Sequence, residues 1–257
     1  MKVSVVLIGY NSWHFLKKNL KSLEFMTGYP DMEIIYIDNA STDHTINYIR
    51  EYFPFVKTHT NSKNLGIAKA RNMGIIKATG KYIWILDSDT EVTEKAFNFL
   101  YAFMEQHPEA GLCGCKMYGQ DGSIQESCRL FPSIKGKLKA GAYILLKKLR
   151  LVKSSIPFYS YNKDYKEAFE VDYVIGACQF IRKEAQKKVG FLDENIFYGP
   201  EDADFCLRMK QAGYLVYYLP QISIYHDYQR ASSHKIFSKI NLKHIQGLIY
   251  YFKKHTL

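Results

Sequence analysis

Short apolar runs alternate with amphipathic segments along the first 90 residues of the chain. The apolar runs lie at 3–8, 32–37, 55–59 and 82–86, and a polar turn follows each of them. Runs of this length that are rich in β-branched residues predict buried strands, and the longer segments between them predict helices. Strands that alternate with helices at this spacing are typical of a parallel sheet. We therefore predict an α/β domain with helices on both faces of its sheet.

The pattern beyond residue 90 predicts a less regular second half. Helices are expected at 93–106, 200–213 and 235–254, and strands at 110–117, 171–177, 214–219 and 222–225. Gly119-Gln120-Asp121-Gly122 is a strong hairpin-turn sequence. Apolar residues spaced by three and four over 134–152 predict an amphipathic helix with a basic face, followed by a loop at 154–165.

Positive charge is concentrated in two blocks of the chain, which has 257 residues and a formal net charge of +10. Between 127 and 163 there is no acidic residue and there are nine Lys or Arg. After His226 the only acid is Asp227, against six Lys or Arg. Such blocks bind nucleic acid, anionic lipid or phosphate-containing substrates. The helix at 134–152 either lies on an anionic bilayer or packs on the core with its basic face in water.

The number of cysteines and the lengths of the apolar runs indicate the cellular compartment in which the protein is expected. The five cysteines are an odd number, which indicates a reducing compartment without a disulfide framework. The apolar run at 3–9 is too short for a signal peptide and leads directly into Tyr10-Asn11. No run reaches the roughly 18 apolar residues that a membrane span needs.

The strand at 82–86 ends abruptly in Asp87-Ser88-Asp89. Ligands of open α/β sheets bind at the carboxyl ends of the strands. Two carboxylates at such a place repel each other and lose solvation unless a cation shares them. Mg²⁺ or Mn²⁺ prefers oxygen ligands and also binds substrate phosphates. The alternative is an Asp-rich turn without a ligand.

Two further polar segments are expected at the same edge of the sheet, because they follow parallel strands. Tyr10 comes after the first strand and Asp38 after the second. An acid after the second strand accepts hydrogen bonds from a nucleotide, or it caps the next helix. Ser41 or Thr42 is the better cap, which leaves Asp38 free for binding. The chain has neither the Gly-x-Gly-x-x-Gly of an NAD site nor a P-loop.

Three other features are candidates with alternatives left open. Arg71 lies inside the helix that begins near Gly66, either as a solvated charge or beside the nucleotide. The small residues Gly176 and Ala177 allow a ligand or another backbone to approach closely. Glu201-Asp202 follows Pro200 at a helix start, where acids often serve only as partners of the helix dipole.

Seven motifs occur together in one order. They are Tyr10-Asn11, the 38–43 loop from Asp38-Asn39 to Asp43, the 64–74 segment with Ala70-Arg71-Asn72, Asp87-Ser88-Asp89, Gly176-Ala177, Glu201-Asp202 and His226. In this order and spacing the chain resembles family 2 inverting glycosyltransferases of the type close to bacterial rhamnosyltransferases, over about residues 3–230. The resemblance implies a GT-A fold, which has a Rossmann-like, mostly parallel central sheet flanked by helices and a smaller acceptor-side subregion.

The resemblance also implies a role for each matching residue. Tyr10, Asp38, Asn39, Arg71, Asp87 and Ser88 would bind the nucleotide sugar. Asp87, Asp89 and His226 would hold Mn²⁺ or Mg²⁺, with Asp89 the most direct ligand. Asp202 would be the general base, and Glu201 beside it would shape the acceptor pocket. Many relatives carry Trp-Gly before this acidic pair, where this chain has Tyr198-Gly199-Pro200, so the difference bears on acceptor identity.

Activity and organisation follow from the same resemblance. A sugar would move in one inverting displacement from a nucleotide-diphosphate sugar, dTDP-rhamnose or a UDP-sugar, to a hydroxyl of a glycan or polyprenyl-diphosphate-linked sugar in cell-surface polysaccharide synthesis. Residues 1–230 would form the catalytic domain, with a nucleotide-binding half at 1–117 and an acceptor half at 118–230. Residues 231–257 would form a basic aromatic helix. The enzyme would work in the cytoplasm, in contact with the anionic inner face of the membrane, without nucleic acid.

Two other function classes remain as alternatives from the residues alone. A sugar-1-phosphate nucleotidyltransferase also combines a nucleotide-binding sheet with Mg²⁺, but it would carry a Gly-rich loop with Arg after the first strand, where this chain has Gly9-Tyr10-Asn11. A non-catalytic basic protein that binds membrane or nucleic acid would explain the charge. It would leave four residues without a role: Asp87, Asp89, Asp202 and His226.

Overall fold

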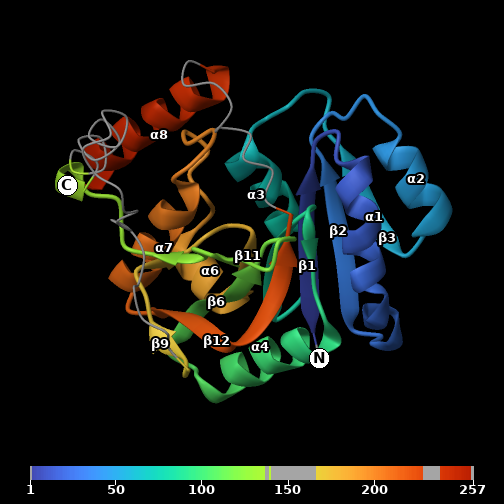
Figure 1. The fold of residues 1–257 in the computed structure, drawn as a ribbon, viewed down its shortest axis with the longest axis horizontal. Helices are drawn as coiled ribbons and strands as arrows, with labels where there is room; N and C mark the ends of the chain where they lie inside the picture. The colour runs from blue at the N-terminus through green and yellow to red at the C-terminus, as the bar shows by residue number, and fades with distance from the viewer. Residues whose placement is uncertain (1, 137–138, 140–165, 228–237, 256–257) are drawn as a thin grey trace.

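A single ten-stranded sheet runs through the molecule, and helices cover both of its faces (Figure 1). The structure is a computed structural model that describes residues 2–136, 139, 166–227 and 238–255. The strands are β1 (Val3–Gly9), β2 (Met32–Asp38), β3 (Val56–Thr60), β4 (Tyr82–Asp87), β5 (Thr90–Glu91), β6 (Ala110–Tyr118), β7 (Ile124–Gln125), β9 (Phe169–Glu170), β11 (Cys178–Arg182) and β12 (Leu215–His226). The strands β8 (Cys128–Arg129) and β10 (Tyr173–Val174) form a separate pair.

The helices pack on the sheet through apolar side chains that alternate along the strands. They are α1 (Trp13–Ser22), η1 (Glu24–Gly28), α2 (Thr45–Tyr52), α3 (Ile67–Lys77), α4 (Glu94–Gln106), α6 (Lys183–Val189), α7 (Glu201–Gln211) and α8 (Lys239–His255). Val5 and Trp84 face the core formed with α1 and α4, whereas Val6 and Ile85 face the core formed with α3 and α7. Because successive side chains of a strand point to opposite faces and both faces are covered, these strands are mostly apolar along their whole length.

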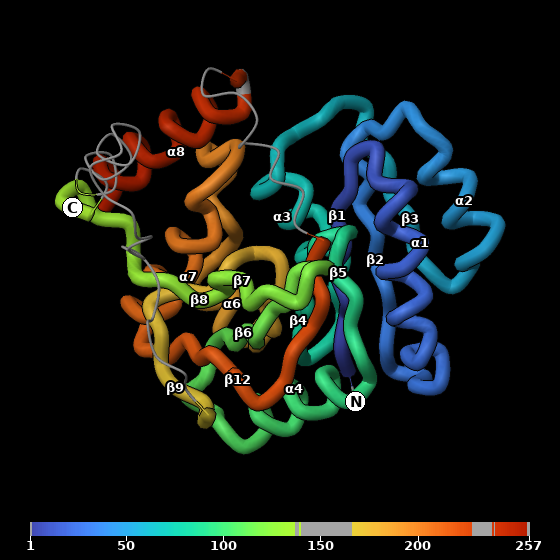
Figure 2. The backbone as a smooth tube through the Cα atoms, viewed as in Figure 1, coloured from blue at the N-terminus to red at the C-terminus, as the bar shows by residue number. Residues whose placement is uncertain are grey.

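The order of the strands confirms the mostly parallel sheet. The main path is β3-β2-β1-β4-β11-β6-β12-β5, and β1 to β4 pair in parallel. β11 lies between β4 and β6 and is antiparallel to both, and the short strands β5, β7 and β9 are also antiparallel to their neighbours. β12, which is close to the end of the chain, pairs in parallel with β6 (Figure 2). The sheet therefore continues from the first half of the chain into the second, and the division at residue 117 stays a prediction.

Three predicted boundaries are wrong. The strand expected at 171–177 is interrupted, since β10 ends at Val174 and β11 starts at Cys178. The two strands expected at 214–225 form one long strand, β12, whose register against β6 shifts between Leu219 and Ser223. Pro220 lies in that shift, where a residue without an N–H group costs no ladder hydrogen bond. The helix after Asp38 begins at Thr45, which is later than a cap at Ser41 or Thr42 predicts.

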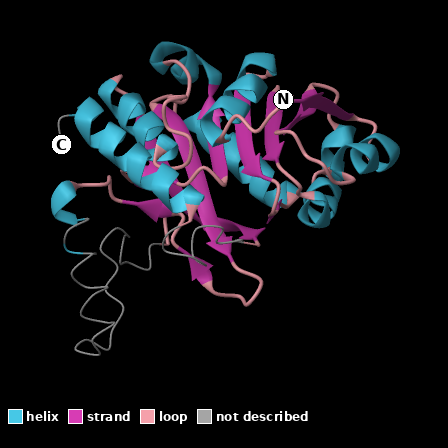
Figure 3. Ribbon diagram, turned by 90° about the horizontal axis from the view of Figure 1, so that it is seen from above, coloured by secondary structure: helices cyan, strands magenta, loops and turns pink. Residues whose placement is uncertain are grey.

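The basic helix predicted at 134–152 and the loop at 154–165 lie largely outside the described residues. The predicted turn at 119–122 is present and joins β6 to β7. The C-terminal helix is present as α8, which lies over α7 (Figures 1 and 3). None of the helices in the described ranges has the length and the apolar character that crossing a bilayer requires.

Candidate active site

The ends of three parallel strands bring the first predicted site residues together. In the sheet register Gly9 lies opposite Asp38, and Ile8 lies opposite Asp87. Tyr10 follows Gly9 directly and is half exposed. The expected common edge of the sheet is therefore confirmed, because strands that pair in parallel end on the same side.

Asp87, Asp89 and His226 form a compact cluster at this edge. Each offers a ligand atom, and these atoms lie within 4.8 Å of one another. The distance from His226 Nε2 to Asp89 Oδ1 is 3.5 Å. His226 reaches the cluster because the end of β12 pairs with β5, where it lies opposite Thr90. Two residues of the Asp-x-Asp sequence and a histidine from the far end of the chain thus share one site.

Burial and the two neighbouring carboxylates change the pKa values of Asp89 and His226 in this cluster. Burial raises the pKa of Asp89, and the neighbouring Asp87 carboxylate adds to the rise, while His226 opposes it. Burial alone lowers the pKa of His226, but the Asp89 and Asp87 carboxylates outweigh burial and raise it. Two carboxylates and an imidazole are a donor set that suits a divalent cation with a preference for oxygen. The residues therefore fit a metal ion such as Mn²⁺ or Mg²⁺.

Gln125 is a part of the cluster that the sequence analysis did not find. Its Oε1 lies 2.8 Å from His226 Nδ1, and its Nε2 donates to the His226 carbonyl oxygen at 2.8 Å. With the Gln125 oxygen as acceptor, the proton sits on Nδ1 and the Nε2 lone pair is directed to the carboxylates. A glutamine after a hairpin turn gives no signal in the sequence that β12 will lie beside it.

Arg71 connects the cluster to the start of α7. Its side chain is buried, with Nη2 donating to Asp87 Oδ1 at 2.6 Å and Nη1 donating to Glu201 Oε1 at 3.0 Å. Nη2 also donates to the Gly176 carbonyl oxygen at 2.9 Å, and a Cβ atom at Gly176 would collide with the guanidinium. The alternative of a solvated helix charge is therefore wrong. The close approach at Gly176 is made by Arg71.

Glu201 and Asp202 have different surroundings although they are adjacent. Glu201 is 4% exposed, and its carboxylate also accepts the Gly199 N–H at 2.6 Å. Burial and the Asp202 charge outweigh Arg71 and raise the pKa of Glu201 to about 7. Asp202 is less buried and accepts the N–H groups of Ala203, at 2.8 Å, and Gly176, at 3.3 Å. The bond to Ala203 is the helix-start role expected of acids here, and it leaves Asp202 facing a cavity.

Two adjoining cavities surround these groups. The β1 cavity, of about 410 Å³, is lined by Tyr10, Asn11, Asn39, Asn64, Ser88, Asp89 and Phe197, among others. The α7 cavity, of about 290 Å³, is lined by Arg71, Arg129, Tyr173, Gly176, Glu201, Asp202 and His244, among others. Asp87 and His226 line both cavities. Asp89 and Asp202, which are far apart in the sequence, therefore face adjoining cavities that share Asp87 and His226 in their walls.

Two of the predicted nucleotide-binding residues, Asp38 and Arg71, do not line the β1 cavity. Asp38 was expected to be free for binding, but it is fully buried, lines neither cavity and accepts the Ser41 N–H at 3.1 Å. The helix cap expected at Ser41 or Thr42 is wrong, since α2 starts only at Thr45. Arg71 lines the α7 cavity and not the β1 cavity that contains Tyr10.

The stability of the fold is expected to depend on Arg71. Arg71→Met leaves the buried Glu201 carboxylate without its cation, which costs roughly 3–5 kcal/mol at pH 8. Because the folded pKa of Glu201 is about 7, above its ordinary value of 4.5, the folded state binds more protons than the unfolded state between these pH values. Glu201 is then neutral at pH 6, and the loss should be smaller there. Urea unfolding at both pH values measures the difference.

Arg50→Met is the matched control, since Arg50 is an exposed arginine on α2. Its free energy of unfolding should change by no more than about 0.5 kcal/mol at either pH. An equal loss for Arg71→Met at pH 6 and pH 8 would contradict a dominant role of the ionised Glu201.

Comparison with known sequences gives a consistent result. Residues 4–190 match the sequence model of the family described as Glycosyl transferase family 2. The chain is 25% identical over 272 residues to N-acetylglucosaminyl-diphospho-decaprenol L-rhamnosyltransferase of Mycobacterium tuberculosis, covering 98% of this chain and 84% of that protein. It is 30% identical over 129 residues to poly(ribitol-phosphate) β-N-acetylglucosaminyltransferase TarS of Staphylococcus aureus, covering 48% of this chain and 22% of that protein.

Solved structures are similar to this chain over most of its length. S. aureus TarS 1–349 in complex with UDP has a TM-score of 0.64 at 20% identity, covering 88% of this chain and 60% of that one. GalNAc-T7 with UDP, GalNAc and Mn²⁺ has a TM-score of 0.68 at 17% identity, covering 98% of this chain and 48% of that one. The chain thus spans less than two thirds of either structure. At this identity the likeness shows the fold, and it confirms the predicted GT-A architecture.

Proposed function

Because the chain belongs to glycosyl transferase family 2, we propose that it is a metal-dependent inverting enzyme that moves a sugar from a nucleotide-diphosphate sugar to a hydroxyl of a glycan or lipid-linked acceptor. The observation that carries this proposal is that two groups of carboxylates face adjoining cavities that share lining residues. The Asp87–Asp89–His226 cluster faces the β1 cavity, and Asp202 faces the α7 cavity. Family membership removes the nucleotidyltransferase and the non-catalytic basic protein from consideration.

The donor is proposed to occupy the β1 cavity. Tyr10 presents an exposed ring at the end of β1 on which a nucleotide base can stack, and Asn39 and Ser88 line the same cavity. Asp38 does not line this cavity, and its proposed role is to hold the loop after β2 by accepting the Ser41 N–H. Arg71 acts from the other side by holding Asp87 in place. TarS with UDP and GalNAc-T7 with UDP and Mn²⁺ share this fold, which supports a nucleotide site here.

Asp89 and His226 are proposed as the direct ligands of Mn²⁺ or Mg²⁺. Asp87 contributes less directly, because Arg71 already binds its Oδ1 atom. A divalent ion there supplies charge neutralisation for a departing diphosphate. The chain itself contributes the orientation of His226 through Gln125 and the alignment of Asp87 through Arg71. This arrangement stabilises negative charge that develops on the leaving group.

Asp202 is proposed as the general base. Its carboxylate is directed into the α7 cavity by two backbone N–H groups, where an acceptor hydroxyl can give up its proton to it. Attack from the α7 side opposes departure toward the β1 side, and this single displacement inverts the anomeric centre. Glu201 is held by Arg71 and the Gly199 N–H, so it shapes the cavity and adds negative charge beside Asp202.

The acceptor is proposed to be a sugar linked through diphosphate to a polyprenyl lipid. The M. tuberculosis relative is, by its name, an enzyme that acts on N-acetylglucosaminyl-diphospho-decaprenol. An acceptor of this kind places the enzyme at the cytoplasmic face of a membrane, as a peripheral protein. The product would be an intermediate of cell-surface polysaccharide synthesis.

A thermal-shift screen of UDP-, dTDP- and GDP-sugars with and without Mn²⁺ tests the donor site. One nucleotide class is expected to raise the melting temperature by several degrees, and only with Mn²⁺ present, because Asp89 and His226 would hold an ion that neutralises the charge of the diphosphate. Mn²⁺ with glucose 1-phosphate is the control for unspecific stabilisation. If no nucleotide sugar changes the melting temperature with Mn²⁺, the donor assignment is wrong.

A further inference from the structure

The C-terminal helix α8 forms a wall of both cavities. Ile240 lines the β1 cavity, and Asn241, His244 and Leu248 line the α7 cavity. α8 is therefore part of the site, although it lies outside the residues that match the family.

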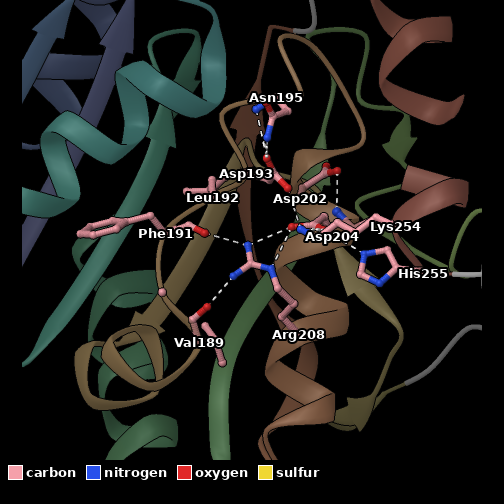
Figure 4. A network of polar contacts seen from close by, with 12 residues as sticks. Val189, Phe191, Leu192, Asp193, Asn195, Asp202, Asp204, Arg208, Lys254 and His255 are labelled. Carbon is pink, nitrogen blue, oxygen red and sulfur yellow. Dashed lines mark hydrogen bonds and ion pairs between the residues drawn. The ribbon is translucent and has the colours of Figure 1, made fainter. Parts of the chain in front are cut away.

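The far end of α8 is fixed to α7 by ion pairs with the buried carboxylate of Asp204 (Figure 4). Lys254 Nζ lies 2.7 Å from both Asp193 Oδ2 and Asp204 Oδ1, and His255 Nε2 lies 2.8 Å from Asp204 Oδ1. Tyr251, one turn earlier, is fully buried. Because Asp204 belongs to the same helix as Asp202, α8 is held in a defined position against the proposed base.

The outer side of α8 carries an exposed apolar stripe. Leu242, Ile245 and Ile249 are 57%, 52% and 50% exposed and follow the spacing of one helix face. Ile245 lies four residues after Asn241 and three before Leu248, so it is their neighbour on the helix surface. The apolar stripe therefore runs along the rim of the α7 cavity.

A second segment at the rim has the same character. Pro132 and Arg129 line the α7 cavity, and Leu130 and Ile134 beside them are 40% and 48% exposed. The segment that contains them lies next to the C-terminal end of α8 (Figures 1 and 3). Two segments that are distant in the sequence thus place exposed aliphatic side chains around one opening.

The two segments themselves carry charges of one sign only. α8 contains no acidic residue, and neither does the chain between 127 and 136. Lys135, Lys243 and Lys253 are exposed on these two segments. We call the five exposed aliphatic residues and these three lysines the rim surface: Leu130, Ile134, Lys135, Leu242, Lys243, Ile245, Ile249 and Lys253.

We propose that the rim surface docks on an anionic phospholipid bilayer, so that the α7 cavity opens at the lipid surface. Aliphatic side chains beside lysines suit the boundary between acyl chains and anionic headgroups. Exposed aliphatic residues gathered at one opening mark an interaction site more than single exposed residues do. The inference rests on the proposed function in one respect, since a lipid-linked acceptor would enter the cavity directly from the bilayer.

Vesicle co-sedimentation of the full chain tests this proposal. Wild type is expected to bind vesicles of phosphatidylcholine with 30% phosphatidylglycerol at least tenfold better than pure phosphatidylcholine at low salt, and to lose most of this preference in 0.5 M NaCl. The variant Leu242→Ser/Ile245→Ser/Ile249→Ser should bind the anionic vesicles at least tenfold more weakly than wild type. Lys135→Glu/Lys253→Glu should also bind them more weakly, without removing any apolar side chain.

The matched control is Tyr52→Ser/Ile76→Ser/Phe99→Ser, which removes exposed apolar residues from α2, α3 and α4. This control should bind vesicles like wild type. Equal binding by the α8 variant and the control would overturn the proposal. Equal binding of wild type to neutral and anionic vesicles would also overturn it. The same holds if the only effect of the α8 variant is a change from dimer to monomer in sedimentation velocity, because the stripe would then be a contact between two copies of the chain.

Failure of the docking surface and failure of the proposed function give different results. Transfer to a GlcNAc-diphosphate carrying a short alkyl chain, in solution without vesicles, should be unchanged in the α8 variant, because its substituted residues line neither cavity. No transfer by wild type with any donor would count against the proposed function alone. Unchanged vesicle binding by the variant would count against the docking surface alone.

Discussion

Asp202→Asn is expected to lower kcat for sugar transfer by roughly 10²- to 10⁴-fold, which is the usual contribution of a general base. The amide keeps the size of the side chain, and its one oxygen can still accept the Gly176 N–H although the bond from Ala203 is lost, so the cavity should keep its shape. Donor affinity should change little, because Asp202 lines the α7 cavity and not the β1 cavity. Initial rates with the short-chain GlcNAc-diphosphate acceptor, together with donor binding by calorimetry, measure both quantities.

Glu201→Gln is the informative comparison for this prediction. Its carboxylate is buried and already bonded to Arg71 and to the Gly199 N–H, so its replacement should affect stability more than kcat. We expect a loss in kcat of about tenfold or less, since no acceptor proton has to reach Glu201. A larger loss in kcat for Glu201→Gln than for Asp202→Asn would show that the two roles are exchanged.

Asp89→Asn is expected to abolish the Mn²⁺-dependent stabilisation by the donor and to lower kcat/KM by at least about 10²-fold. The reason is charge: the variant removes one of the two carboxylates whose mutual repulsion in a buried place favours a cation. The loss corresponds to about 3 kcal/mol or more of transition-state stabilisation. Thermal shift with donor over a range of Mn²⁺ concentrations separates lost metal affinity from lost activity.

Two neighbouring variants calibrate this result. Gln125→Ala leaves all three proposed ligands in place but removes the partner of His226 Nδ1, so Mn²⁺ affinity should fall by about 10- to 100-fold. Asp227→Asn removes a nearby acid that is bonded to Gln120, and it should change Mn²⁺ affinity little. If Asp227→Asn were as damaging as Asp89→Asn, general negative charge would explain the site better than the defined cluster.

Local patterns in the chain were sufficient for the first half of the fold. The apolar runs and the turns after them placed β1, β2 and β4 within one or two residues. Once these strands pair in parallel, Tyr10, Asp38 and Asp87 must lie at one edge, since strands of the same direction end on the same side. Asp89 and His226 were assigned to one site only through the resemblance to a family, because no local pattern joins residues so far apart.

The surroundings of each site residue were decided by packing between distant segments. Arg71 and Glu201 are 130 positions apart, and Gln125 and His226 are 101 apart, so the burial of the arginine and the partner of the histidine depend on how α7 and β12 return to the sheet. The same packing buries Glu201 and leaves its neighbour Asp202 facing the cavity. The residue types and the strand ends followed from the sequence, since hydrophobic period and chain direction are local properties. Burial, pKa and hydrogen-bond partners needed the tertiary structure, because they arise from segments that meet only in the folded protein.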